Sequence, residues 1–196
     1  RDFGFVVTGK DGYFSEEKRD CDTKTETVAP GIPAFSITNT ARDGLYRIEK
    51  HIVTDPARAC VLQRISFTAL KGDVTDYRVT ALLAPHLVNA GKLNSAWIGE
   101  FEDKPVLFAT GRSRYLALIS DTPWRAESAG FVGVSEGWRQ LKQHGRISEQ
   151  YQRADDGNVA LAGELGFTND CTQATLAIGF GPVSYTHLRA HETVLD

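Results

Sequence analysis

The sequence predicts an all-β fold, an antiparallel β-sandwich with one short helix near residues 135–144. Two observations lead to this fold class. Apolar residues alternate with polar ones along many short segments, which is the pattern of antiparallel strands that bury one face and expose the other. Turn sequences rich in Gly and Asp separate these segments at short intervals, and many short strands with such turns favour a sandwich.

Alternation defines the expected strands in the first half of the chain. A first strand ends at the Gly-Lys-Asp-Gly turn of residues 9–12. Along three later segments the apolar residues share one parity, so we expect each segment to place these side chains on a common core face. These residues are Tyr46, Ile48 and Ile52, then Val61, Ile65, Phe67 and Ala69, then Tyr77, Val79, Ala81 and Leu83.

Turn sequences mark the expected strands in the second half. The Asp-Asp-Gly-Asn sequence at residues 155–158 predicts a β-hairpin, because Gly accepts positive φ and an Asp side chain satisfies local backbone donors. Polar turns at 102–104 and 111–114 have the same role. The strands expected between these turns cover residues 97–101, 106–108, 115–120, 148–153, 159–165 and 174–180.

One helix is expected, beginning after Ser135. Ser135 is a favourable N-cap, and Glu136 places negative charge in the first turn, where the helix dipole stabilises it. Trp138 and Leu141 fall on one helix face. Gly145 follows the last turn, at the position where helices commonly end in a left-handed residue.

The two ends of the chain are expected to be incomplete or foreign. The chain begins with Arg1 and contains no Met, which indicates an internal piece of a longer protein. The β alternation stops at residue 183, and the following YTHLRAHET is typical of a translated cloning or sequencing adapter. We therefore assign residues 1–182 to one β-sandwich domain and leave the tail 183–196 out of fold arguments.

Composition excludes several classes of partner. A net charge of −3 and a pI near 6.0 do not provide the clustered basic surface that nucleic-acid binding requires. No apolar run approaches the roughly 20 residues that cross a bilayer, so no membrane partner is expected. Cys21, Cys60 and Cys171 have neither zinc-site spacing nor the even number of a disulfide framework. We expect all three to be small structural residues on the strands of the sandwich.

No catalytic or metal-binding constellation is predicted, and no cofactor is expected. His187 and His191 have the i, i+4 spacing of zinc ligands, but the His that would complete a zincin pattern is missing and both lie in the tail. Ser135 lies in a Gly-x-Ser-x-Gly sequence, yet a nucleophile elbow needs a parallel α/β sheet. The carboxylate pairs that a glycosidase needs all lie in or beside turns, where acids are common: Glu16–Glu17, Asp73–Asp76, Glu100–Glu102 and Asp155–Asp156.

Three tryptophans and one histidine remain as candidate site residues. Sugar rings stack their apolar faces on indoles, so Trp97, Trp124 and Trp138 are candidates for carbohydrate binding. The commoner role of a tryptophan is to anchor a core or a domain interface, and we prefer this interpretation. His86 ends a strand after Pro85 and is a further candidate for lining a surface.

Several segments, taken in their order and spacing, are similar to one known family. They are FSEEKRD at 14–20, NSAWIGE at 94–100, SAGFVGVSEGW at 128–138, LKQHGR at 141–146 and DDGNVAL at 155–161. Together they resemble the N-terminal β-sandwich domain of bacterial glucoamylases and glucodextranases, glycoside hydrolase family 15. The resemblance covers nearly the whole chain before residue 183 and implies a super-β-sandwich that precedes an (α/α)6 catalytic barrel.

The resemblance also implies where the chemistry lies. Such enzymes release glucose from the non-reducing ends of α-glucans with inversion, using two glutamates of the barrel. No position of this chain matches the motifs of those glutamates, so the resemblance implies no catalytic residue here. It further implies additional strands before Arg1 and after Gly181, and a glucan-degrading parent would suit secretion or export to the periplasm.

Two functions of different classes therefore stay open. The first is a structural module that packs on the C-terminal catalytic barrel and helps to shape the rim of its pocket, which we expect. The second is an autonomous carbohydrate-binding module that holds α-glucan oligosaccharides on exposed Trp97 or Trp138. A small hydrolase is a third, weaker interpretation. A tryptophan that faces the barrel would lie in an apolar patch, whereas a sugar platform would have polar donors around an exposed ring.

Overall fold

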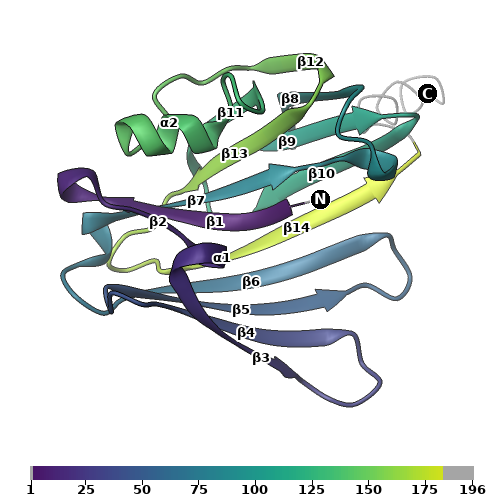
Figure 1. Cartoon of the computed structure of the whole chain (residues 1–196). Helices are drawn as coiled ribbons and strands as arrows, with labels where there is room; N and C mark the ends of the chain where they lie inside the picture. Colours follow the sequence, from purple (N-terminus) through teal and green to yellow (C-terminus); the bar gives the residue numbers. More distant parts are fainter. Residues whose placement is uncertain (1, 183–196) are drawn as a thin grey trace.

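A computed structural model describes residues 2–182 as two antiparallel β-sheets packed face to face (Figure 1). The predicted fold class is confirmed. The smaller sheet has five strands in the order β11-β13-β7-β1-β2. Their bounds are β1 (Asp2–Gly9), β2 (Phe14–Glu16), β7 (Tyr77–Ala84), β11 (Trp124–Phe131) and β13 (Val159–Leu165).

The larger sheet has nine strands in the order β12-β8-β9-β10-β14-β6-β5-β4-β3. The parities predicted for β5, β6 and β7 are confirmed, because Ile48, Phe67 and Val79 are all buried between the sheets. The bounds are β3 (Cys21–Thr27), β4 (Ala34–Ala41), β5 (Tyr46–Thr54), β6 (Cys60–Ala69), β8 (Asn94–Phe101), β9 (Lys104–Gly111), β10 (Arg114–Ser120), β12 (Arg153–Gly157) and β14 (Gln173–Gly181).

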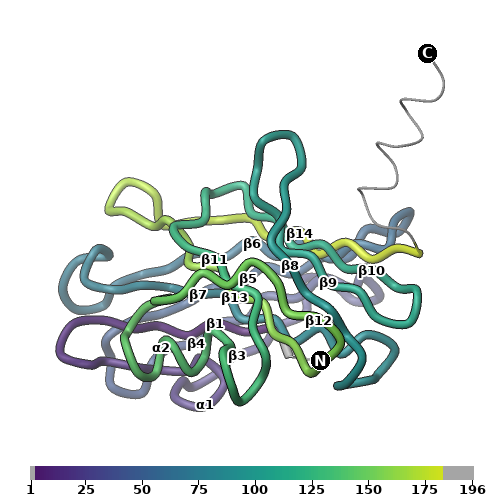
Figure 2. Tube along the Cα trace, turned by 90° about the horizontal axis from the view of Figure 1, so that it is seen from above, coloured from purple at the N-terminus to yellow at the C-terminus, as the bar shows by residue number. Residues whose placement is uncertain are grey.

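Within residues 2–182 two α-helices accompany the sheets. Helix α1 (Glu17–Asp20) is a single turn between β2 and β3, and helix α2 (Gly137–His144) lies on the outer face of the smaller sheet, beside β13 and β1 (Figures 1 and 2). Short 3-10 turns occupy Lys10–Gly12, Val74–Asp76 and Leu87–Asn89. None of the described helices is long and apolar enough to cross a membrane.

The start of β1 and the finish of β14 lie at the same end of the sandwich, here named the N/C end (Figure 1). In the smaller sheet Asp2 pairs with Ala84, and the connection 85–93 leads from there to Asn94 of the larger sheet. In the larger sheet Ser95 pairs with Thr110, Gly111 with Arg114, and Tyr115 with Gly181. Gly181 therefore lies at the same end as Asn94. The connections 28–33, 55–59 and 112–113 therefore also lie at the N/C end.

The predicted N-cap of the helix is wrong. Helix α2 begins at Gly137, with Glu136 at the N-cap position and no side-chain cap. The hydroxyl of Ser135 instead accepts a hydrogen bond from the Phe131 backbone N–H (2.9 Å) and closes the turn after β11. The predicted C-terminal cap is confirmed, because Gly145 has φ of 66° and donates its N–H to the Leu141 carbonyl.

The predicted hairpin around residues 155–158 is also wrong. Residues 148–152 form no strand, because the Gln140 side chain binds the backbone N–H groups of Ser148 and Glu149 (3.0 and 2.8 Å). Strand β12 begins later, at Arg153, and it belongs to the larger sheet whereas β13 belongs to the smaller. The Asp-Asp-Gly-Asn sequence therefore carries the chain from one sheet to the other. Cys171 likewise lies outside the named strands, in an exposed isolated bridge.

Candidate functional site

Trp138 stands between two hollows on the outer face of the smaller sheet. The indole is partly exposed and packs edge to face on Phe14, with ring centroids 5.7 Å apart and an interplanar angle of 85°. The first hollow has a volume of about 360 Å³, and the cross-strand partners Gly4 and Leu82 are part of its lining. The second, of about 610 Å³, lies beside Phe14. Glu16, Arg19 and Trp138 line both hollows.

Helix α1 forms the wall opposite α2, and buried polar contacts fix it in place. Glu17 of α1 is 1% exposed and its Oε1 lies 2.8 Å from Nζ of Lys50 on β5. The second carboxylate oxygen of Glu17 accepts a hydrogen bond from Asn39 (3.2 Å). Because a buried charge needs a partner in a fixed geometry, this ion pair ties α1 to the larger sheet.

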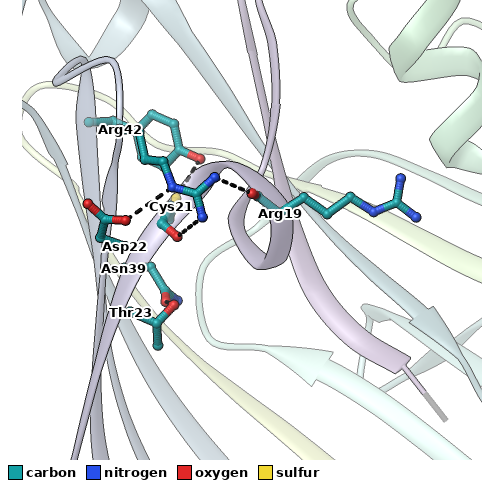
Figure 3. A network of polar contacts seen from close by, with 7 residues as sticks. Arg19, Cys21, Asp22, Thr23, Asn39 and Arg42 are labelled. Atoms are coloured by element: carbon teal, nitrogen blue, oxygen red, sulfur yellow. Dashed lines mark hydrogen bonds and ion pairs between the residues drawn. The ribbon is translucent and has the colours of Figure 1, made fainter.

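Arg42 anchors the end of α1 from the opposite side (Figure 3). Its guanidinium donates to the carbonyl oxygens of Arg19 (2.9 Å) and Cys21 (3.3 Å) and to the carboxylate of Asp22 (3.1 Å). The Arg19 carbonyl belongs to α1 and the Cys21 carbonyl directly follows it, at positions where helix carbonyls lack intrahelical partners. Arg42 of the β4–β5 turn therefore holds the wall that carries Arg19.

Trp97 lies on the outer face of the larger sheet and is covered on both sides. It stacks on Phe108 of β9, with centroids 5.3 Å apart and an interplanar angle of 18°. The guanidinium of Arg153 on β12 lies 5.5 Å from the indole centroid. Because β9 and β12 flank β8 on opposite sides, a sugar ring would have to displace one of these two neighbours to stack on Trp97.

Trp124 and His86 both make contacts that stabilise the fold. The Trp124 ring lies over Gly163, where an added Cβ would be 2.6 Å from it, and the ring packs against the main core. Its buried Nε1 has no hydrogen-bond partner among the described residues. His86 lies in the connection 85–93 and its Nε2 is 3.1 Å from Oδ1 of Asn158, so it joins this connection to the β12–β13 turn.

Large exposed apolar side chains gather at the N/C end. Val88 and Leu93 in the connection 85–93 are 54% and 56% exposed. Both have positive φ, which is strained for a β-branched or bulky residue. The set, named here the N/C apolar surface, comprises Val28, Ile32, Phe35, Val88, Leu93, Phe131, Val132, Val134 and Phe180. Sequence reasoning missed it, because six of these residues lie in connections, whose exposure alternation does not predict, and Phe35, Phe131 and Phe180 lie at or next to strand ends.

Three of the predicted carboxylate pairs have a member with a structural partner among the described residues. Of the predicted carboxylate pairs, Glu17 is ion-paired with Lys50, and Asp73 and Asp76 form a capping box on a 3-10 turn. Asp155 binds Arg153 (2.7 Å). Within residues 2–182 no three His, Cys, Asp or Glu side chains group as metal ligands do. The predicted pair His187 and His191 lies outside the described residues.

The described residues thus define a two-layered antiparallel β-sandwich domain with one apolar end. The family model "Glucodextranase, domain N" matches residues 1–195. The chain therefore belongs to this family of N-terminal domains, as the sequence motifs predict.

The similar proteins are glycoside hydrolases of much greater length. The glucoamylase of Clostridium sp. (strain G0005) is 27% identical over 181 residues, which is 92% of this chain and 26% of the relative. A bacterial glucoamylase solved in complex with acarbose has 25% identity and a TM-score of 0.91, over all of this chain and 29% of that structure. An inverting mannosidase from Bacteroides thetaiotaomicron shares the fold (TM-score 0.51, 10% identity, 99% of this chain and 24% of that one). The chain thus spans about a quarter of the length of these proteins.

Proposed function

We propose that this chain is the non-catalytic N-terminal module of an α-glucan-hydrolysing enzyme and that it packs through its N/C apolar surface on the catalytic domain of the same protein. The observation that carries the proposal is the concentration of exposed apolar side chains at one end of the sandwich. Exposed patches of this kind mark protein interfaces. Strand β14 ends at Gly181, at this same end.

The hydrolytic step belongs, in this proposal, to the (α/α)6 barrel. Inverting hydrolysis needs two carboxyl groups about 6.5–9.5 Å apart, one as acid and one as base, with water between them. Glu17, Asp76 and Asp155 each have a structural partner in this chain, which supports their exclusion as catalytic groups. We accordingly expect the purified chain to release no glucose from maltooligosaccharides.

A chimeric enzyme tests the docking surface. In the Clostridium glucoamylase, this chain would replace the N-terminal segment that it matches. We expect the chimera to fold and to release glucose, and the double substitution Val88→Asp, Leu93→Asp to lower both its thermal midpoint and its activity. Leu70→Asp is the matched control, because Leu70 is also exposed (42%) but follows β6 at the opposite end. Equal effects of the two sets of substitutions would contradict this proposal.

A further inference from the structure

We propose that the two hollows beside Trp138 form one binding site for a short α-linked glucose oligosaccharide. The site adjoins the N/C apolar surface, with which it shares Val132, and uses α2, β2 and the one-turn helix α1. The choice of glucose and of the α-linkage rests on the proposed function. The choice of a sugar rests on the lining of the two hollows, on the Trp138 ring and on the Glu16–Arg19 pair.

The two hollows offer the two kinds of surface that a sugar chain presents. The lining of the first includes the apolar residues Gly4, Val6 and Leu82 and, from α2, Trp138. The second is rimmed by charged side chains, among them Asp20, Asp43 and Lys142. A pyranose has apolar C–H faces and a belt of hydroxyl groups, so it can fill the first kind of surface and hydrogen-bond to the second.

The Trp138 ring lines both hollows and packs against the buried cluster around Leu141. Phe14 meets it edge to face, whereas Trp97 is enclosed between Phe108 and Arg153 and Trp124 packs against the main core. An indole carries an N–H donor, so the Trp138 ring combines an apolar face with a group that can bind a hydroxyl. An amphipathic ring of this kind suits a sugar better than it suits a wholly apolar partner.

Glu16 and Arg19 provide polar groups beside this ring. Both line the two hollows together with Trp138, and the Arg19 guanidinium lies 3.3 Å from the Glu16 carboxylate. A carboxylate accepts and a guanidinium donates hydrogen bonds, so the pair can bind neighbouring hydroxyls of one sugar ring.

The site is built on a rigid support. The Glu17–Lys50 ion pair and the contacts of Arg42 hold the backbone of α1, and therefore the base of the Arg19 side chain, in place. Preorganised groups lose less entropy when a ligand binds. The volumes of about 360 and 610 Å³ on the two sides of Trp138 indicate an oligosaccharide rather than a single sugar.

The experiment uses the three indole N–H signals of the full chain in ¹H–¹⁵N NMR spectra, assigned with Trp→Phe variants. Maltohexaose should shift the Trp138 signal saturably and leave those of Trp97 and Trp124 in place, so two tryptophans serve as internal controls. Arg19→Ala should weaken binding at least tenfold. Arg58→Ala is the matched control, because Arg58 is an exposed arginine of the β5–β6 turn that lies in neither hollow.

Three results would overturn the proposal. One is an unmoved Trp138 signal at about 10 mM maltohexaose, where even weak complexes form. Another is unchanged binding in Arg19→Ala. The third is a Trp138 signal that responds to the Clostridium catalytic domain added in trans but not to sugar, which would make the hollows a contact site for polypeptide. Since the titration needs no catalytic domain, its failure is distinct from failure of the chimera.

Discussion

Glu17 and Lys50 form a buried ion pair, with Oε1 and Nζ 2.8 Å apart, between the helix α1 and the larger sheet. Both are inward-facing residues that are at most 9% exposed. Removing one partner from such a pair leaves an uncompensated charge in the protein interior, which is far more costly than the loss of an exposed pair.

We therefore expect Lys50→Met to lower the free energy of unfolding by about 3–5 kcal/mol. The double variant Glu17→Leu, Lys50→Met should recover much of this loss, because it leaves no unpaired charge. Lys24→Met, in an exposed pair with Glu26, should change stability by less than about 1 kcal/mol. Urea denaturation measures all three, and similar losses for Lys50→Met and Lys24→Met would disprove the argument.

This ion pair also shows where sequence reasoning ends. The alternation of Tyr46, Ile48 and Ile52 correctly predicts the inward face of β5, and position 50 belongs to that face. A lysine there breaks the apolar pattern. Its partner Glu17 is 33 residues away, on a helical turn too short to be predicted from periodicity. Local pattern predicts strands and their faces, but it does not predict which distant charge compensates a buried one.

The candidate tryptophans illustrate the same limit. Trp97 and Trp138 are equally plausible sugar platforms in the sequence, and their immediate neighbours do not separate them. The two strands that flank Trp97 bring Phe108 and Arg153 against its faces, and strand order is a property of the whole fold. The N/C apolar surface is likewise assembled from turns and strand ends that are distant in the chain.

Gly137 and Ala162 set the distance between α2 and the smaller sheet. A Cβ added at Gly137 would lie 2.4 Å from the Cβ of Ala162, which is fully buried. We expect Gly137→Ala to destabilise the domain by about 1–3 kcal/mol, although alanine favours a helix, because the contact has no room for a methyl group.

The double variant Gly137→Ala, Ala162→Gly tests whether this contact is the cause. It removes the methyl group that the new one would meet, so it should regain part of the lost stability. Gln143→Ala, on the exposed face of α2, should have an effect within about 0.5 kcal/mol. Thermal denaturation followed by circular dichroism gives these values, and a stabilising Gly137→Ala would show that α2 moves freely on the sheet.

Glu127 of β11 makes stability depend on pH. Burial raises the pKa of this half-buried carboxyl above its ordinary value. Between the unfolded pKa, about 4.3, and the raised folded pKa, the unfolded state binds fewer protons, so stability falls as the pH rises through this window. Glu127→Gln should therefore be more stable than the parent chain at pH 7, and the difference should disappear below about pH 4.

The matched control for this pH dependence is Glu149→Gln, since Glu149 is exposed. It should leave the slope of stability against pH nearly unchanged. Denaturant titrations between about pH 3 and 8 follow both variants. A Glu127→Gln variant that loses stability at neutral pH would mean that the carboxylate is stabilised by a partner in the folded state.

Arg153 covers one face of Trp97, and its removal should expose that indole. We expect Arg153→Ala to increase quenching of tryptophan fluorescence by acrylamide and to cost about 0.5–1 kcal/mol, the usual size of an exposed cation–π contact. Arg114→Ala, in the β9–β10 hairpin, is the control and should not change the quenching. If maltohexaose then shifts the Trp97 signal in Arg153→Ala but not in the parent chain, the guanidinium is what keeps sugar from this ring. If quenching stays at the parent value, Phe108 and the strand backbone already cover the indole without help from Arg153.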